Sequence, residues 1–144
     1  MIEEKNIKIE EQIKFKGRFI SEIGKRKTAV AQIRLFKNGT GVVTIGDKKI
    51  NEYFNPEQLF LINQPLKQSG HLKDFNLSIL VNGGGKKAQA IAVRHGISKL
   101  LVNIDKELKP ALRAKGFMTR DDRKKERKKP GLKKARRAPQ WAKR

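Results

Sequence analysis

The sequence predicts an α+β domain, a two-layer sandwich with helices on one face of a small, mostly antiparallel sheet. Strand-like patterns fill the first part of the chain and helix-like patterns follow them, which is typical of this class. The length of 144 residues suits one modest core with flexible ends. The last 26 residues are too basic and too poor in apolar residues to form a core. We therefore expect a flexible leader (1–14), a globular domain (15–118) and a long, disordered basic tail (119–144).

Alternating apolar residues predict the first strands, which follow a charged leader that fits neither helix nor strand. A first strand is expected within Phe15–Ile23, and Ala29–Phe36 alternates as a half-buried strand does. The segment between them carries three consecutive cations and is expected to be a turn. Asn38-Gly39 is a dipeptide typical of hairpin turns with positive φ angles, so Val42–Ile45 is predicted to return alongside the preceding strand.

The middle of the chain predicts short helical pieces between residues 51 and 70. A helix is expected to open at Asn55-Pro56-Glu57, because Asn caps a helix, Pro suits its first turn and an acid favours its N-terminus. Pro65 is expected to end this helix. Its core candidates are the bulky apolar residues Leu59, Phe60 and Ile62.

The clearest strand, Phe75–Val81, leads through three glycines into the longest predicted helix, Lys86–Ile104. Gly96 in the middle of that helix costs about 1 kcal/mol against Ala, which indicates a close packing contact. A second helix is expected over Lys106–Lys115, capped by Asp105 and ended by Gly116. The residues of the long helix that should face the sheet are Ala90, Val93, Ile97, Leu101 and Ile104, and those left to solvent or RNA are Lys87, Arg94 and Ser98.

Positive charge dominates the chain, with 35 Lys and Arg against 14 Asp and Glu and a net charge of +21. The tail holds 13 of these cations and three acids, which leaves 22 cations and 11 acids in the rest of the chain. A chain of this sign binds nucleic acid or an anionic membrane. The membrane is the weaker alternative, because no apolar run approaches the ~20 residues of a spanning helix. A dense polyanion such as RNA is the partner that the tail predicts.

Two turns are candidates for phosphate binding. Lys25, Arg26 and Lys27 crowd the segment between the first two strands, where they suit a turn pressed onto phosphates or, alternatively, a merely solvated one. Gly83-Gly84-Gly85 precedes a helix whose exposed amides can hold an anion. It is not a nucleotide-binding P-loop, because Leu80 and Lys87 stand where that motif needs Gly and Ser or Thr.

Other chemistries have little support in the sequence. Without cysteine there is neither a disulfide framework nor thiol chemistry, and His71 and His95 lack the companions that a zinc site needs. We therefore expect no metal and no cofactor. The acidic start of the chain argues against a signal peptide and a transit peptide.

Several spaced motifs resemble the family of the ninth protein of the bacterial small ribosomal subunit. The body contributes Gly24-Lys25-Arg26-Lys27-Thr28-Ala29, Gln64-Pro65-Leu66, Gly83-Gly84-Gly85, Gln89-Ala90 and Arg94-His95-Gly96-Ile97. The ending of the chain, Glu126 to Arg144 with its runs of Lys and Arg, is similar to the signature tail of that family. The resemblance covers about Phe19 to Arg144, nearly everything except the leader.

The resemblance implies the fold of the second domain of ribosomal protein S-five, with a left-handed crossover, and a structural, non-enzymatic role in the ribosome. It implies partners in small-subunit rRNA of the head, neighbouring head proteins and P-site tRNA, in the cytoplasm or in a plastid. The residues expected to bind rRNA are Lys25, Arg26, Lys27, Gly83, Gly84, Gly85, Lys86, Lys87, Arg94, Arg127, Lys128, Lys129, Lys133, Lys134, Arg136 and Arg137. The residues expected to contact tRNA are Trp141, Lys143 and Arg144.

The chain departs from the family pattern at a few positions and leaves two other classes of function to compare. Ala88 and Ile91 stand where the family usually has glycine, and Trp141 keeps an aromatic ring where it usually has Phe. An enzyme is one alternative, since related folds include catalysts, but no acid–base pair, activated nucleophile or metal set is evident. A chromatin-like DNA-binding protein shares the charge but not the order of the motifs.

Overall fold

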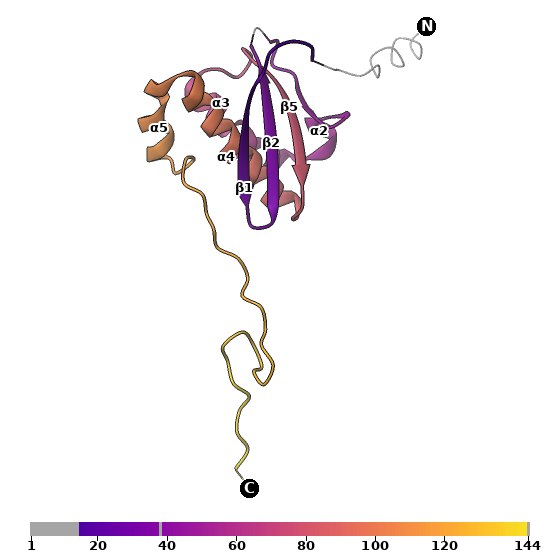
Figure 1. Ribbon diagram of the computed structural model, residues 1–144, viewed down its shortest axis with the longest axis vertical. Helices are drawn as coiled ribbons and strands as arrows, with labels where there is room; N and C mark the ends of the chain where they lie inside the picture. Colours follow the sequence, from indigo (N-terminus) through magenta and orange to yellow (C-terminus); the bar gives the residue numbers. More distant parts are fainter. Residues whose placement is uncertain (1–14, 38, 144) are drawn as a thin grey trace, which may run out of the picture.

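The computed structural model describes residues 15–37 and 39–143, so the leader predicted for residues 1–14 lies outside the described residues. Four strands come first, but a fifth strand, β5 (Asn76–Asn82), interrupts the helices that follow them, so strands and helices are not fully separated along the chain (Figure 1). The elements are β1 (Ile20–Arg26), β2 (Ala29–Phe36), β3 (Val43–Ile45), β4 (Lys48–Lys49), α2 (Ile50–Tyr53), α3 (Pro56–Ser69), β5 (Asn76–Asn82), α4 (Lys86–Ile104), a 3-10 turn (Lys106–Leu108) and α5 (Lys109–Ala114).

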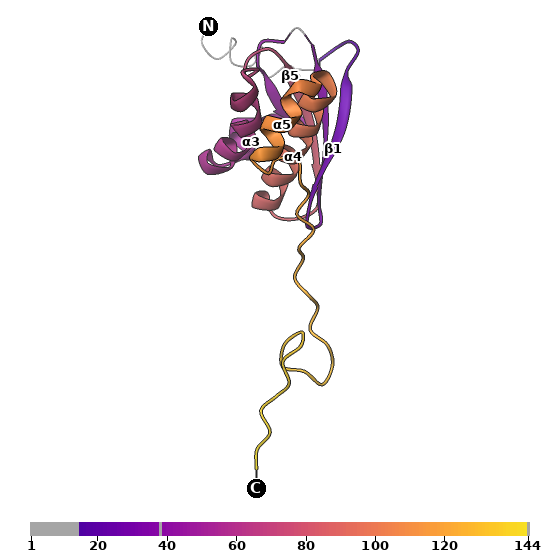
Figure 2. The same ribbon diagram turned by 90° about the vertical axis from the view of Figure 1, so that its left-hand side faces the viewer.

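The five strands form one mixed sheet in the order β1-β2-β5-β3-β4. Three of its four pairings are antiparallel, and only β3 and β5 run parallel. The α3, α4 and α5 helices lie on one side of this sheet (Figure 2). The predicted α+β class with a mostly antiparallel sheet is therefore confirmed, whereas the hand of the crossover between β3 and β5 stays a prediction.

The core lies between the sheet and α4. Alternate residues of β2 are buried, as the sequence pattern predicts, and their neighbours point to the open face of the sheet. Ile33 on β2 pairs with Ile79 on β5, and both are fully buried. The α4 helix has the predicted bounds, and its buried apolar residues are Ala88, Ala90, Ala92, Val93, Ile97, Leu100 and Leu101.

Two glycines let β1 and α4 approach each other closely. A Cβ atom on Gly96 would lie 2.5 Å from Cδ1 of Ile33 and 3.1 Å from the backbone nitrogen of Gly24. A Cβ on Gly24 would lie 2.5 Å from the backbone nitrogen of Gly96. The close packing contact predicted for Gly96 is thus confirmed, and its partners are Ile33 and Gly24.

The hairpin predicted after β2 is wrong. β3 does not return beside β2, because β5 occupies that place and β3 pairs with the far edge of β5. The expected positive φ lies at Gly41 (+83°) and not at Gly39, while Asn38 lies outside the described residues. The amide of Gly39 donates to the carbonyl of Asp74 at 3.1 Å, so this loop is bound to the segment before β5.

The α3 helix continues through Pro65, so the predicted end at that residue is wrong. It runs to Ser69 and ends at Gly70, whose φ of +76° is left-handed. Pro65 is buried with Ile62, so apolar packing outweighs the loss of one backbone donor. Phe60, predicted as a core residue, is 59% exposed, because it lies on the outer side of the helix.

The chain after α4 follows the predicted capping signals. Oδ1 of Asp105 accepts from the amide of Glu107 at 2.9 Å, and Gly116 has a φ of +73° beyond the end of α5. The predicted single helix over Lys106–Lys115 is divided into a 3-10 turn and α5. Residues 118–143 contain no helix or strand, and the part of this segment beyond Arg123 leads away from the domain (Figures 1 and 2).

Candidate nucleic-acid interface

The two turns predicted to bind phosphate lie side by side at one end of the sheet. The pairing of Val30 with Asn82 brings the β1–β2 turn next to the β5–α4 turn. Gly83 and Gly84 have φ angles of +70° and +66°. A Cβ on Gly83 would lie 2.6 Å from the carbonyl oxygen of Thr28. These glycines therefore allow one turn to pack on the other, and the tail leaves the domain at the same end (Figure 1).

The first turn exposes fewer free cations than the sequence predicts, because β1 extends to Arg26. Only Lys27 lies in the turn itself, with a φ of +50°, the one non-glycine residue with positive φ in the described part of the chain. Lys25 and Lys27 are exposed. The side chain of Arg26 is only 13% exposed and lies 3.0 Å from Oδ2 of Asp121. The prediction of three cations crowded into one turn is corrected to two exposed lysines and one paired arginine.

The glycine turn leads into the N-terminus of α4, whose first turn contains no acid. Lys86 donates from Nζ to the carbonyl oxygen of Tyr53 at 3.3 Å and lies over the Tyr53 ring, so its charge is partly engaged. The hydroxyl of Tyr53 donates to Oε1 of Gln89, whose Nε2 donates to the carbonyl of Gly83 at 3.0 Å. This chain of contacts holds the turn in shape, while Lys87 points outward and is exposed.

The side of α4 expected to face solvent or RNA is partly covered. Ser98 is fully buried, and its hydroxyl donates to the carbonyl of Arg94 at 2.8 Å, so its predicted exposure is wrong. Nη1 of Arg94 donates to Oε1 of Gln64 at 3.2 Å, and its guanidinium lies 5.2 Å from the centre of the Phe117 ring. Burial lowers the pKa of Arg94 from its ordinary value. Arg94 is therefore packed between α3 and the segment that follows α5.

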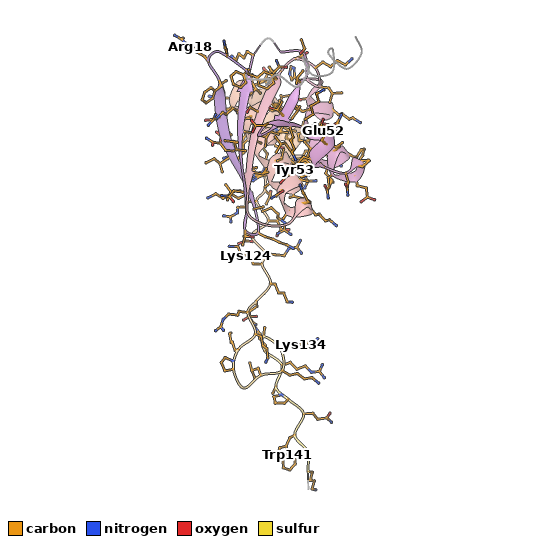
Figure 3. All side chains as sticks on the ribbon, turned by 90° about the vertical axis from the view of Figure 1, so that its right-hand side faces the viewer. Arg18, Glu52, Tyr53, Lys124, Lys134 and Trp141 are labelled. Atoms are coloured by element: carbon orange, nitrogen blue, oxygen red, sulfur yellow. The ribbon has the colours of Figure 1, made fainter. Side chains whose placement is uncertain are left out.

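The tail presents exposed cations around one closed loop. Glu126 accepts from Nζ of Lys129 at 3.1 Å and from Nε of Arg136 at 2.9 Å. The amide of Lys133 donates to the carbonyl of Arg137 at 2.7 Å, which closes the loop (Figure 3). All the tail residues predicted to bind rRNA are exposed, namely Arg127, Lys128, Lys129, Lys133, Lys134, Arg136 and Arg137.

The tip of the tail is open to a partner. Trp141 is 80% exposed and lies far from the domain (Figure 3). Lys143 is exposed as well, whereas Arg144 lies outside the described residues.

Two features of this region were missed from the sequence. Lys124 and Lys125 are exposed, and Lys124 lies just beyond the domain (Figure 3). They could have been included from the basic composition of the tail alone. The pairing of Arg26 with Asp121 joins residues 95 positions apart, and no local pattern indicates it.

The described residues also bear on the other kinds of site. None of their helices has the length and apolar character to cross a membrane. Within the same part of the chain, His, Asp and Glu do not gather in groups of three or more that could hold a metal ion. A comparison with models of known protein families matches residues 24–144 to the family described as ribosomal protein S9/S16.

Proposed function

The chain belongs to the ribosomal protein S9/S16 family, structural proteins of the small ribosomal subunit, and on this premise we propose that it binds rRNA of the subunit head. The observation that carries the proposal is the convergence of two turns and the tail at one end of the sheet. Three exposed lysines lie in or next to the two turns and can contact phosphates there, namely Lys25, Lys27 and Lys87. The exposed amides at the start of α4 add donors for an oxygen of the RNA backbone.

The tail extends the same surface. Its exposed cations neutralise further phosphates, and counterion release then contributes much of the affinity. Gly85 supports a close approach of RNA, because no atom lies within 4 Å of the place where a Cβ would be. Gly83 and Gly84 serve the packing of the two turns instead, so their part in RNA binding is indirect.

Matched charge removal tests this interface. We expect the double variant Lys27→Ala and Lys87→Ala to bind a head rRNA fragment about 10-fold or more weakly, since each charge-assisted contact contributes ~1.5–3 kcal/mol at most. Lys37 and Lys73 are exposed and lie next to the opposite ends of β2 and β5, so their double replacement by Ala is the control. Equal loss of affinity in both double variants would refute a localised interface and leave only general charge attraction.

The tip of the tail is proposed to contact P-site tRNA through Trp141, Lys143 and Arg144. The 15 residues from Pro130 could span about 50 Å if extended, which is enough to leave the domain. An exposed indole can stack on a base or ribose, and a guanidinium can bind a phosphate with two parallel hydrogen bonds.

Deletion of Lys143 and Arg144 tests the tip separately from the rest of the tail. We expect normal subunit assembly and P-site tRNA binding weaker by ~1–3 kcal/mol, the scale of one or two charge-assisted contacts. The dissociation of P-site tRNA from purified variant subunits is the measurement, and deletion of Met1–Lys5 is the control. Unchanged tRNA retention with defective assembly would mean that the tip binds rRNA.

A further inference from the structure

The segment that follows α5 remains bound to the domain for several residues before the tail becomes free. The amide of Phe117 donates to the carbonyl of Leu112 at 3.1 Å, and the ring of Phe117 lies under the guanidinium of Arg94. The backbone of Met118 lies close enough to His95 to affect the pKa of its ring. Phe117 and Met118 are both partly buried against the core. The start of the tail is thus held against α4.

Arg26 makes the last contacts of this bound segment. Its Nη2 lies 3.0 Å from Oδ2 of Asp121, and its Nη1 donates to the carbonyl oxygens of Asp121 and Arg123, both at 3.1 Å. A planar guanidinium is suited to several acceptors at fixed angles, and a lysine could not reproduce this arrangement. Asp121 also accepts from Arg123 at 2.8 Å, which closes a small network around its carboxylate.

The backbone of β1 that carries Arg26 is held against α4. β1 lies against α4 where Gly24 meets Gly96. Nζ of Lys99 on α4 lies 2.7 Å from Oε2 of Glu22 and donates to the carbonyl of Ile23 at 3.1 Å. The amide of Lys25 points to Nδ1 of His95 at 3.4 Å. Because β1 is bound to α4 on both sides of Gly24, Arg26 cannot follow the movements of the tail.

We propose that Arg26 is a positioning residue that fixes where, and in which direction, the basic tail leaves the domain. A free chain of n residues spreads over about 5–6 Å × √n, so an early release would scatter the tail over the whole surface. Anchoring at Asp121 and Arg123 starts the tail beside Lys27 and shortens its free part to residues 124–144. This raises the local concentration of the tip in one direction. The effect of this anchoring on tRNA binding rests on the proposed function, whereas the anchoring by Arg26 does not.

A distance measurement between two spin labels tests the anchoring. The chain has no cysteine, so Gln68→Cys on α3 and Lys124→Cys after the anchor give two unique labelling sites in the full chain. We expect one narrow distance distribution in the parent and a width at least ~twofold larger in Arg26→Gln, as for a freely jointed segment. Asp121→Asn should broaden it less, because both carbonyl acceptors remain. Lys27→Gln removes the same charge next to Arg26 and should leave the width unchanged.

The outcomes separate this proposal from the proposed function. Equal widths in the parent and in Arg26→Gln would overturn the anchoring. The anchoring would also be overturned if Arg26→Gln kept a narrow distance distribution and lost as much rRNA affinity as Lys27→Gln. In that case Arg26 would be a phosphate ligand. In variant subunits we expect Arg26→Gln to release P-site tRNA faster than Lys27→Gln does. Suppose that deletion of residues 130–144 leaves tRNA retention unchanged while Arg26→Gln still broadens the distance distribution. The proposed contact with tRNA would then be refuted, and the anchoring by Arg26 would be supported.

Discussion

Replacement of Gly24 by alanine should destabilise the domain strongly, and more than the same replacement at Gly96. The new Cβ would lie 2.5 Å from the backbone nitrogen of Gly96 and would also overlap the carbonyl oxygen of Ala92. Non-bonded atoms pack well at about 3.5–4.0 Å, so β1 and α4 would have to separate by more than about 1 Å. Neither obstructing atom belongs to a flexible side chain, and the surrounding core therefore cannot adapt by a change of rotamer.

The magnitude follows from this geometry. Inserting a methyl group into a packed core costs about 1–3 kcal/mol, and a clash with two backbone atoms belongs at the upper end or beyond it. A loss of about 3 kcal/mol lowers the melting temperature by roughly 10 °C or more for a domain of this size. Gly96→Ala should cost less, because it meets the movable Cδ1 of Ile33 and gains about 1 kcal/mol of helix propensity.

Thermal unfolding followed by circular dichroism is the assay, with Gly85→Ser as the matched control. No atom lies within 4 Å of a Cβ at Gly85, and serine is a favoured residue at the N-cap position that Gly85 occupies. The control should melt at or slightly above the temperature of the parent. A Gly24→Ala variant that melts within about 2 °C of the parent would refute the close contact between β1 and α4, since that shift corresponds to less than about 1 kcal/mol.

Three further predictions concern charge. Burial and the nearby Lys99, Arg120 and Arg94 lower the pKa of His95, so the folded protein favours the neutral ring. The contribution of His95 to stability should be fully present above the ordinary pKa of 6.5 and should be lost as the pH falls through the pKa of the folded state. Melting curves between pH 8 and 5 measure this loss, and His95→Gln should reduce the dependence on pH. The pKa of Asp121 is held well below its ordinary 3.8 chiefly by Arg123 and further by Arg26, so a spin label at position 124 should keep its mobility from pH 7 to about 4, and a change in that range would contradict the ion pair. Affinity for head rRNA should fall with salt, each neutralised phosphate adding about 0.7–0.9 to the slope of log K against log salt, and a slope near zero would contradict phosphate binding.

Local patterns in the sequence predicted the elements whose stabilising contacts are periodic. Ala29–Phe36 is predicted and observed with the same bounds, because one face of β2 is buried by α4 and the alternation of side chains reports it. The bounds of Lys86–Ile104 also agree, since this helix has its apolar side on the sheet and glycine at its start. Asp105 and Gly116 were identified as cap and terminator, because capping depends on residues within one helical turn.

The errors arise where distant contacts outweigh local preference. Asn38-Gly39 favours a hairpin, but β5 takes the place beside β2, and the chemistry of a turn cannot indicate a strand that begins only at Asn76. Pro65 stays inside α3 because its ring is buried, and burial is decided by the whole fold. The same holds for the candidate interface. The two basic turns were found from composition, but their meeting at one end of the sheet depends on the pairing of β2 with β5.

The acids of the tail explain why its cations are not equivalent. Asp121 engages Arg26 and Arg123, while Glu126 engages Lys129 and Arg136. The pairs that involve Arg123, Lys129 and Arg136 are exposed and contribute little stability, yet each holds a guanidinium or an ammonium in a defined place. A phosphate that binds a paired cation must compete with a carboxylate, whereas one that binds an unpaired lysine only displaces counterions. The salt dependence should therefore count fewer phosphates than the 13 cations of the tail, and Glu126→Gln, which frees two of them, should steepen the slope. A slope that is unchanged by Glu126→Gln would mean that RNA already separates these pairs when it binds.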